Sequence, residues 1–394
     1  MKKKFMCMFM AAAMTLSMAA CGSKGDDANN DANAGGASDG VQTFTVGTSG
    51  PLTGDNAIYG VAVKQGVELA VNEINASDST IKFKFLSQDD EADGEKAVNA
   101  YNNMMDNGMQ VLVGPTTTGA SIAVADACYT DRTFMLTPSA SSPAVIEGKD
   151  NQYQMCFMDP NQGSASAQYI SEKKLGTKIA VIWKNDDVYS KGIHDTFATK
   201  AAEAGLEVVS DTTFADGNDT DFSVQLADAQ KGGAELVFLP MYYQHASLIL
   251  AQAAAMNFAP KWFGVDGMDG ILTMKGFDTS LAEGVMLLTP FNADSTDERT
   301  AAFVKKYQEM YGEVPNQFAA DAYDCVYAYA QALEAAGATP DMSAADLCAK
   351  MIEQFTSMTF DGLTGNGMTW NEQGQVTKSP KGMVIQNGAY VGLD

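Results

Sequence analysis

The sequence VLVGPTTTGAS occupies residues 111–121 and combines three local signals around which the rest of the chain can be interpreted. A short β-branched run ends at Gly114-Pro115, three threonines follow, and small residues then begin a segment of helical composition. The pattern predicts a strand that leads directly into the N-terminus of a helix, where unpaired backbone N–H groups and threonine hydroxyls converge. Such a turn is typical of a site that binds a small anion.

A second turn of the same chemistry, LTPSASSP at residues 136–143, ends the next predicted strand. Further polar and aromatic side chains follow other predicted strands, at residues 186–189, at residues 241–243 and at Asp266. Parallel strands present their carboxyl ends at one edge of a sheet, so these side chains should meet in one cleft. Because the set contains hydroxyls, tyrosines and an acid but no lysine or arginine, we expect the two turns to bind the carboxylate and ammonium of an amino acid.

Strands and helices alternate from residue 44 almost to the end of the chain. This alternation predicts two α/β halves with largely parallel, Rossmann-like sheets. Strands are expected at residues 44–48, 82–86, from 111, 134–137, 178–183, 207–213, 235–239, 262–265, 285–289, 382–385 and 389–391, and helices at residues 59–75, 94–107, 120–131, 189–204, 222–231, 244–257, 300–311 and 318–336.

Length and charge limit the possible classes of protein. A chain of 394 residues exceeds what one hydrophobic core usually organises, which favours two domains. Its formal net charge of -24, from 49 acidic and 25 basic residues, would repel phosphate backbones and anionic lipid. We therefore expect no nucleic-acid partner and no peripheral electrostatic contact with a membrane.

The N-terminus has the pattern of an export signal. Lys2, Lys3 and Lys4 precede an apolar run at residues 5–18, and Met18-Ala19-Ala20-Cys21 follows. This resembles a bacterial lipoprotein signal at residues 1–20, with Cys21 as the lipidated first residue of the mature chain. Residues 21–40, rich in glycine, alanine and aspartate, predict a flexible tether. A plain secretory signal and an uncleaved anchor are the alternatives.

Enzymatic and metal chemistry lack their usual motifs. Neither His194 nor His245 lies in an H-E-x-x-H pattern, and both are expected to be solvated helix residues. The chain has no Walker loop and no G-x-G-x-x-G turn. We therefore expect no enzymatic activity, no metal and no cofactor. Disulfides and free buried thiols remain equally open for Cys128, Cys156, Cys325 and Cys348.

With these residues in place, the chain from about residue 41 to its end resembles the leucine/isoleucine/valine-binding proteins, the type I periplasmic binding proteins of branched-chain amino acid ABC transporters. Thr118 stands where the family has a hydroxyl that binds the ligand carboxylate, and T-P-S-A-S at residues 137–141 corresponds to its T-P-A-A-T turn. Asp266 in WFGVDGMDG stands where leucine-binding members have the glutamate that pairs with the ligand ammonium. The ligand-binding residues that the resemblance implies are Tyr59, Thr118, Ser139, Ala140, Ser141, Tyr189, Tyr242 and Asp266.

The same resemblance implies a division into two lobes joined by three crossovers. The first lobe would comprise residues 41–159 plus 291–377, and the second residues 160–290 plus 378–394. The implied function is an extracytoplasmic, lipid-anchored, monomeric receptor. It would bind a branched-chain or other apolar amino acid by cleft closure and deliver it to an ABC transporter permease and its separate ATPase. A urea- or amide-binding transporter component, a ligand-presenting sensory protein and a lipoprotein hydrolase are the alternatives.

Overall fold

The structure is a computed structural model that describes residues 40–393 of the chain. The predicted signal at residues 1–20, the lipidated Cys21 and the tether up to residue 39 lie outside the described residues. From Gly40 onward the chain forms one compact unit. Within residues 40–393, no helix is both long and apolar enough to cross a membrane.

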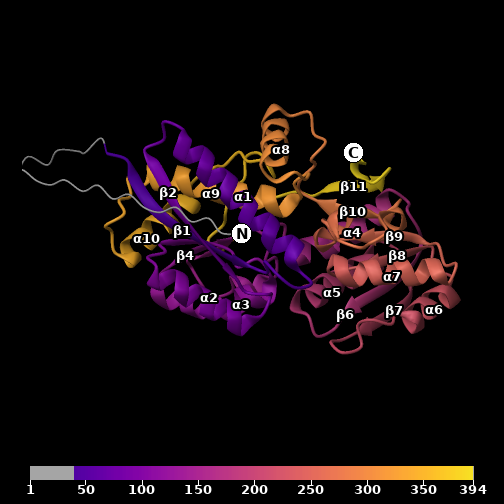
Figure 1. The fold of residues 1–394 in the computed structure, drawn as a ribbon. Coiled ribbons are helices and arrows are strands. Elements are labelled where there is room, and N and C mark those ends of the chain that lie inside the picture. The colour runs from indigo at the N-terminus through magenta and orange to yellow at the C-terminus, as the bar shows by residue number, and fades with distance from the viewer. Residues whose placement is uncertain (1–39, 394) are drawn as a thin grey trace, which may run out of the picture. The chain divides into compact units, whose positions relative to one another are not determined.

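The first half of the chain builds a five-stranded parallel sheet in the order β2-β1-β3-β4-β5 (Figure 1). Side chains alternate between its faces, as the two-residue period of a strand requires. Val111 and Val113 pack on the face with α1 and with α9 (Gln317–Ala335), whereas Leu112 packs on the face with α2 and α3. The elements are β1 (Gln42–Gly50), α1 (Ala57–Ala76), β2 (Ile81–Asp89), α2 (Gly94–Asp106), β3 (Val111–Val113), α3 (Thr118–Asp131), β4 (Phe134–Thr137), the 3-10 turn η1 (Pro143–Val145) and β5 (Gln152–Gln154).

The middle of the chain and its C-terminal hairpin build a seven-stranded sheet in the order β12-β11-β10-β9-β8-β6-β7. Strands β6 to β10 pair in parallel, and β11 and β12 pair antiparallel at one edge. The elements are α4 (Asp159–Glu172), β6 (Lys178–Lys184), α5 (Val188–Glu203), β7 (Glu207–Phe214), α6 (Ser223–Gly232), β8 (Leu236–Leu239), α7 (Tyr243–Ala255), β9 (Lys261–Gly264), η2 (Asp266–Met268), η3 (Ile271–Thr273), η4 (Thr279–Ala282), β10 (Met286–Thr289), β11 (Lys381–Gln386) and β12 (Ala389–Gly392).

Three helices between β10 and β11 return to the first sheet. These are α8 (Glu298–Tyr311), α9 (Gln317–Ala335) and α10 (Ala344–Phe355), of which α9 contacts β2, β3 and β4. We call the five-stranded sheet with α1–α3 and α8–α10 the first lobe, and the seven-stranded sheet with α4–α7 the second lobe. The chain therefore passes between the sheets three times, after β5, after β10 and before β11. The residues at which the two lobes divide stay a prediction.

The structure confirms the α/β class with largely parallel sheets and differs from the sequence prediction at three elements. Strand β5 has the polar sequence QYQ, which carries no strand signal. Helix α4 begins at Asp159-Pro160, where a proline in the first turn is compatible with helix geometry; the sequence suggested only a crossover there. Helix α10 was also not predicted, although Ser343 caps it by accepting a hydrogen bond from the N–H of Asp346.

A buried ion pair ties the third passage to the first lobe. The Lys378 ammonium lies 2.5 Å from an Asp321 carboxylate oxygen and 2.7 Å from the Thr364 hydroxyl, and its side chain is fully buried. Asp324 on the same helix accepts hydrogen bonds from the N–H groups of Leu363 and Thr364. A buried charge is tolerated only when it is paired in this way, so the segment before β11 is held against α9.

Helices α1 and α9 approach closely at Gly66. A Cβ built on Gly66 would lie 2.1 Å from the carbonyl oxygen of Ala319. Gly66→Ala should therefore lower the free energy of unfolding by about 1–3 kcal/mol, the usual cost of overpacking, in chemical denaturation. Gly119→Ala is the control, since nothing lies within 4 Å of its added Cβ. Equal stability of Gly66→Ala and the parent would contradict the close packing of the two helices.

Candidate functional site

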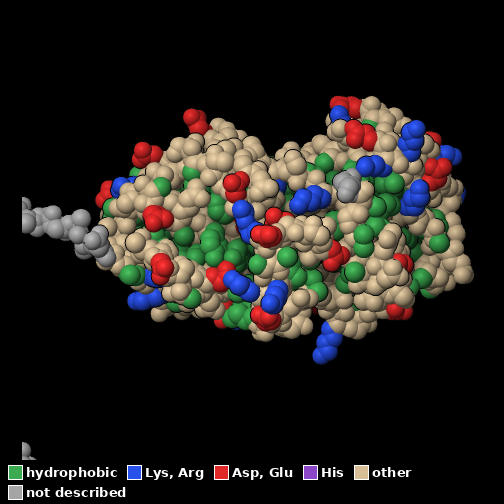
Figure 2. Space-filling model, turned by 90° about the horizontal axis from the view of Figure 1, so that it is seen from above, with side chains coloured by type: hydrophobic (Ala, Val, Ile, Leu, Met, Phe, Trp, Pro, Cys, Tyr) green, Lys and Arg blue, Asp and Glu red, His purple; other side chains and the backbone are tan. Residues whose placement is uncertain are grey.

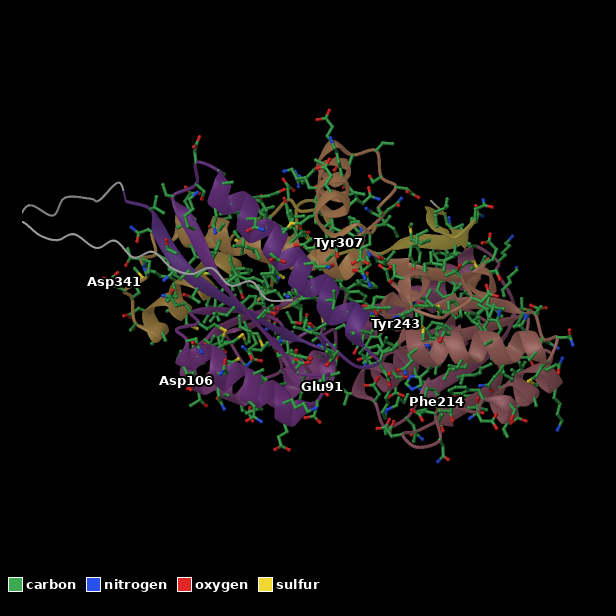
Figure 3. All side chains as sticks on the ribbon, viewed as in Figure 1. Glu91, Asp106, Phe214, Tyr243, Tyr307 and Asp341 are labelled. Carbon is green, nitrogen blue, oxygen red and sulfur yellow. The ribbon has the colours of Figure 1, made fainter. Side chains whose placement is uncertain are left out.

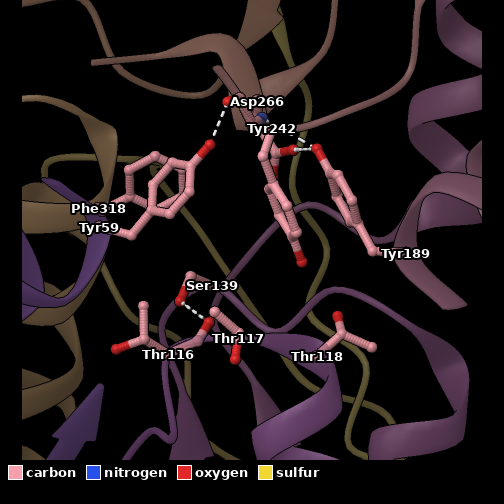
Figure 4. A pocket seen from close by; sticks show the side chains of 10 residues that line it. Tyr59, Thr116, Thr117, Thr118, Ser139, Tyr189, Tyr242, Asp266 and Phe318 are labelled. Carbon is pink, nitrogen blue, oxygen red and sulfur yellow. Dashed lines mark hydrogen bonds between the residues drawn. The ribbon is translucent and has the colours of Figure 1, made fainter. Parts of the chain in front are cut away.

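A cavity with about 290 Å³ of empty volume lies between the two lobes (Figure 4). Helices α1, α3 and α9 and the turn after β4 line it from the first lobe, and α5, the segment before α7 and η2 line it from the second. Tyr59 and Phe318 lie side by side and face Tyr242 and Tyr189, as Figure 4 shows. The lining residues are Tyr59, Thr116, Thr117, Thr118, Ser139, Tyr189, Tyr242, Asp266, Gly267 and Phe318.

The start of α3 forms the base of this cavity. The first hydrogen bond of the helix runs from the N–H of Ser121 to the carbonyl of Thr117, at 2.9 Å. The N–H groups of Thr118 and Gly119 precede that bond and have no carbonyl within the helix to accept them. The first turn carries no acidic side chain, and the Thr117 hydroxyl is buried without a hydrogen-bond partner among the described residues. The base of the cavity is thus rich in donors and suited to an anion.

The two turns predicted from the sequence lie against each other. The Ser139 hydroxyl donates a hydrogen bond to the carbonyl of Thr116 at 2.5 Å, and the Thr137 hydroxyl donates to the carbonyl of Pro115 at 3.0 Å. Thr116 in turn donates from its hydroxyl to the carbonyl of Ser49, at 3.1 Å. These bonds fix the positions of the hydroxyl-bearing residues relative to β1, β3 and β4.

Ala140 and Ser141 do not line the cavity. Both are fully buried, and their carbonyl oxygens are occupied by the protein. The Ala140 carbonyl accepts from the Gln154 side-chain amide at 2.8 Å, and the Ser141 carbonyl accepts from the N–H of Asp159 at 3.0 Å. The contact of these two residues with a ligand stays a prediction.

The second lobe supplies a stacked tyrosine pair beside a buried carboxyl group. The rings of Tyr189 and Tyr242 have centroids 4.8 Å apart and planes within 1° of parallel. The Tyr189 hydroxyl donates to an Asp266 carboxylate oxygen at 2.5 Å and accepts from the N–H of Gly267 at 2.9 Å. The N–H of Asp266 donates to the side-chain oxygen of Gln162 at 3.2 Å. These bonds hold the carboxyl group at the wall opposite the start of α3.

Burial dominates the electrostatics of this wall. It raises the pKa of Asp266 to about 7, although hydrogen bonds from Tyr189 and Gln162 act in the opposite direction. Burial also raises the pKa of Asp159 well above its usual value and raises that of Asp187. No lysine or arginine is present among the described residues that line the cavity. A cation next to Asp266 would therefore compensate a charge that the protein itself leaves uncompensated.

The sequence did not point to Phe318 or Gly267. Phe318 lies in the first turn of α9, about 260 residues after Tyr59 in the chain, and packs edge-on against that ring with centroids 4.9 Å apart. No local signal marks a core-facing phenylalanine as a cavity wall. Gly267 directly follows Asp266, which was predicted, so its position could have been inferred from its neighbour.

The histidines and cysteines are not part of the cavity. The prediction that His194 is solvated is wrong, because its ring stacks on Trp183 with centroids 4.0 Å apart and lies 3.0 Å from an Asp211 oxygen. His245 is also partly buried, 3.3 Å from Asp219. The structure resolves the open question on the cysteines, since the four in the described chain are free and buried. Among residues 40–393 no histidine, cysteine, aspartate or glutamate cluster is arranged to hold a metal ion.

Two lobes of parallel α/β structure with a small, donor- and acid-lined cavity between them define a protein that binds a small molecule by enclosing it. The sequence model of the periplasmic binding proteins matches residues 43–388, and the chain belongs to this family. Its members are substrate-binding proteins rather than enzymes.

Several curated relatives and solved structures carry related names. A Leu/Ile/Val-binding protein of Rhizobium johnstonii is 27% identical over 305 residues, covering 76% of this chain and 82% of the relative. A leucine-, isoleucine-, valine-, threonine- and alanine-binding protein of Pseudomonas aeruginosa is 25% identical over 343 residues, covering 85% and 88%. A leucine binding protein of Thermotoga maritima superposes with a TM-score of 0.80 at 25% identity over 89% of this chain and 98% of that one. A branched-chain amino acid transporter substrate binding protein of Streptococcus pneumoniae, in complex with isoleucine, gives 0.79 at 26% identity over 89% and 100%.

The pKa of Asp266 predicts a pH-dependent stability of the ligand-free protein. In the folded chain this pKa is about 7, whereas the ordinary value is 3.8. Between these two values the folded state binds more protons than the unfolded state, so the free energy of unfolding should fall as pH rises from about 4 to about 7. One such group contributes at most about 1.4 kcal/mol per pH unit.

Asp266→Asn cannot titrate and should lose this part of the slope, measured by urea denaturation at several pH values between 4 and 8. Burial also raises the pKa values of three other carboxyl groups to about 6, those of Asp90, Asp269 and Asp321. These groups titrate in both proteins, so their contributions to the slope cancel when the two proteins are compared. Identical slopes for the parent and the variant would contradict a protonated, buried Asp266.

Proposed function

We propose that this chain is an extracytoplasmic receptor that binds an amino acid with a branched or otherwise apolar side chain and delivers it to the permease of an ABC transporter. One observation carries the proposal: a cavity between two lobes has unpaired N–H donors on one wall and the buried Asp266 on the other. The two walls are complementary to the two charges of a zwitterion.

The geometry assigns a part of the ligand to each wall. The α-carboxylate would accept hydrogen bonds from the first turn of α3 and from the Thr118 hydroxyl, where the helix dipole also favours negative charge. The α-ammonium would lie at Asp266, whose carboxyl group would ionise as the cation arrives. An apolar side chain would then contact the rings of Tyr59, Tyr242 and Phe318, which exclude water from it. Ser139 and Tyr189 would position these groups.

Closure of the lobes would couple binding to recognition by a partner. The carboxylate site lies on the first lobe and Asp266 on the second, so only the closed form makes both sets of contacts and the ligand shifts the population toward it. Hinge closure around ligands is known for periplasmic binding proteins as a class. The three passages between the sheets would act as the hinge, with lobe boundaries near residues 159–160, 290–291 and 377–378. A permease with a separate ATPase would then distinguish the closed monomer from the open one.

The ligand class rests on two further observations. The cavity lining combines aromatic rings with a few polar groups, which suits a small molecule that has an apolar part. The relatives named above bind leucine, isoleucine, valine, threonine or alanine according to their names.

The surface and the N-terminus support an exported, tethered protein. On the face shown in Figure 2, lysine and arginine side chains are interspersed with acidic ones and form no broad basic patch. Attachment to the membrane would therefore depend on lipid at Cys21, in a bacterial cell envelope, rather than on surface charge.

A thermal-shift screen of the twenty amino acids and urea tests the proposal on the chain from Gly40 onward. Leucine, isoleucine or valine should raise the unfolding temperature most, because a ligand at about 100 times its Kd stabilises the folded state by about 2.7 kcal/mol. If only urea or short amides raised the unfolding temperature, the ligand would be an amide and not an amino acid. No shift with any of these compounds would reject the proposed ligand class.

The role of Asp266 is tested by a ligand that lacks the ammonium group. Asp266→Asn should weaken leucine binding by about 10- to 100-fold, the worth of one charged hydrogen bond. The same substitution should leave the binding of 4-methylpentanoate unchanged or stronger in isothermal titration calorimetry. Asp228→Asn, on the exposed side of α6, is the matched control for loss of a carboxylate. Equal weakening of both ligands would assign Asp266 a role other than pairing with the ammonium.

A further inference from the structure

The Tyr59 hydroxyl is fully used by hydrogen bonds within the protein. It donates to the carbonyl of Gly267 and accepts from the N–H of Tyr243, at 3.1 Å. Tyr59 belongs to α1 of the first lobe, whereas both partners belong to the second lobe. Its side chain is only 2% exposed, and a phenolic hydroxyl has one proton to donate. That proton is already committed to Gly267.

We propose that Tyr59 is an interlobe latch, in which its hydroxyl holds the closed arrangement of the lobes and thereby sets how slowly a bound ligand leaves. The sequence predicted instead that this tyrosine contacts the ligand. The inference rests on the proposed function for its ligand and goes beyond it by assigning the Tyr59 hydroxyl to closure of the lobes, while the Tyr59 ring remains part of the cavity wall.

Packing around the ring directs the hydroxyl across the seam. The Tyr59 ring contacts Phe318 of its own lobe, and its centroid lies 4.9 Å from that of Tyr243 and 5.5 Å from that of Tyr242 in the second lobe. Close packing on both sides leaves the ring few alternative positions. Figure 4 shows the hydroxyl pointing away from the threonines and toward the segment that carries Asp266.

Tyr243 makes the reciprocal connection. Its hydroxyl donates to the carbonyl of Asp55 in the loop before α1, at 2.6 Å. Figure 3 shows Tyr243 at the junction between the N-terminal end of α1 and the second lobe. Each of the two tyrosines thus belongs to one lobe and bonds the backbone of the other, so opening of the lobes must break both connections.

Gln317 makes a different set of contacts, beside the second passage of the chain. Its N–H donates to Asp269 at 2.8 Å, its side-chain amide donates to the carbonyl of Asp266 at 3.1 Å, and its side-chain oxygen accepts from Thr289 at 2.8 Å. Because Thr289 ends β10, where the chain leaves the second sheet, relative motion of the lobes should be smallest there. The hydrogen bonds of Tyr59 and Tyr243 are therefore the ones that should form and break as the lobes close and open.

The hydrogen bonds of Tyr59 and Tyr243 involve no ligand atom. They therefore favour the closed form whether or not the cavity is occupied. The apparent affinity of a protein is its intrinsic affinity multiplied by the fraction that is competent to bind tightly. Loss of the Tyr59 hydroxyl would leave the Gly267 carbonyl and the Tyr243 N–H unpaired in the closed form only, since water can reach them in the open form. The closed state would lose population without any change in ligand contacts.

Tyr59→Phe keeps the ring and removes the latch. We expect the dissociation rate to rise by about tenfold, the worth of one to two hydrogen bonds, by the same factor for leucine, valine and alanine in stopped-flow measurements. The association rate should not fall. Tyr243→Phe should act in the same direction. Tyr311→Phe, whose hydroxyl bonds Gln65 and Glu68 within the first lobe at 3.1 and 3.2 Å, should leave the dissociation rate unchanged.

A second measurement needs no ligand. Spin labels at Asp106→Cys and Val224→Cys, both exposed and on different lobes, report the interlobe distance. The four native cysteines in the described chain are buried and should stay unlabelled. Tyr59→Phe should shift the distances of the unliganded protein to larger values than in the parent.

A rate change that differs between ligands, or a slower association, would mean that Tyr59 bonds the ligand and would overturn the latch. Unchanged dissociation rates together with an unchanged distance distribution would also overturn it. Failure of every amino acid to bind the parent would instead reject the proposed function, and the distance measurement would still decide on the latch.

Discussion

Burial of one carboxyl group in a seam without a cation is the constraint on which the rest of the structure depends. Asp266 is 5% exposed and lies between two lobes whose contributions to the cavity include no lysine or arginine. A carboxylate in such a place is costly unless it is protonated or paired. The protein supplies the phenol of Tyr189, which donates to the carboxyl group, and the side-chain oxygen of Gln162, which accepts from the Asp266 backbone N–H. These bonds orient the carboxyl group without neutralising it. The site is therefore organised to receive a positive charge from outside.

The opposite wall has the complementary property for a different reason. A helix that starts at the end of a parallel strand leaves N–H groups without acceptors, and the fold turns the start of α3 toward the cavity. These N–H donors require no additional side chains, because the connection from strand to helix leaves them unpaired. The acid on the other wall requires aromatic residues to bury it. The two halves of the site thus have separate physical origins and lie on different lobes.

Separation of recognition from closure follows from this division. The start of α3 and Asp266 line the cavity, whereas the hydroxyls of Tyr59 and Tyr243 bond backbone groups of the opposite lobe. A receptor built in this way can alter its ligand preference at one set of residues and its opening rate at another. The Lys378–Asp321 pair and Gln317 lie beside the passages between the sheets, where they restrain the segments about which the lobes would move.

The sequence by itself determined the alternation of strands and helices, the α/β class and the two hydroxyl-rich turns, because hydrophobic period, glycine-proline breaks and threonine-rich helix starts are local signals. It also selected Thr118, Ser139, Tyr189, Tyr242 and Asp266 among the residues that line the cavity, since side chains just after parallel strands gather at one edge of a sheet. It did not predict α10, β5 or the helical start at Asp159, whose local patterns are weak or ambiguous.

Only the tertiary structure decided which side chains line the cavity and which form hydrogen bonds with other parts of the protein. Phe318 enters the wall from a helix far along the chain, whereas Ala140 and Ser141 are buried and their carbonyls accept hydrogen bonds from Gln154 and Asp159. Tyr59 keeps the place that the sequence predicted, but its hydroxyl is taken by Gly267 and Tyr243, more than 180 residues away in the chain. The physical reason is that a hydrogen bond depends on distance in space, and contacts between two lobes join segments whose sequences carry no information about each other's position.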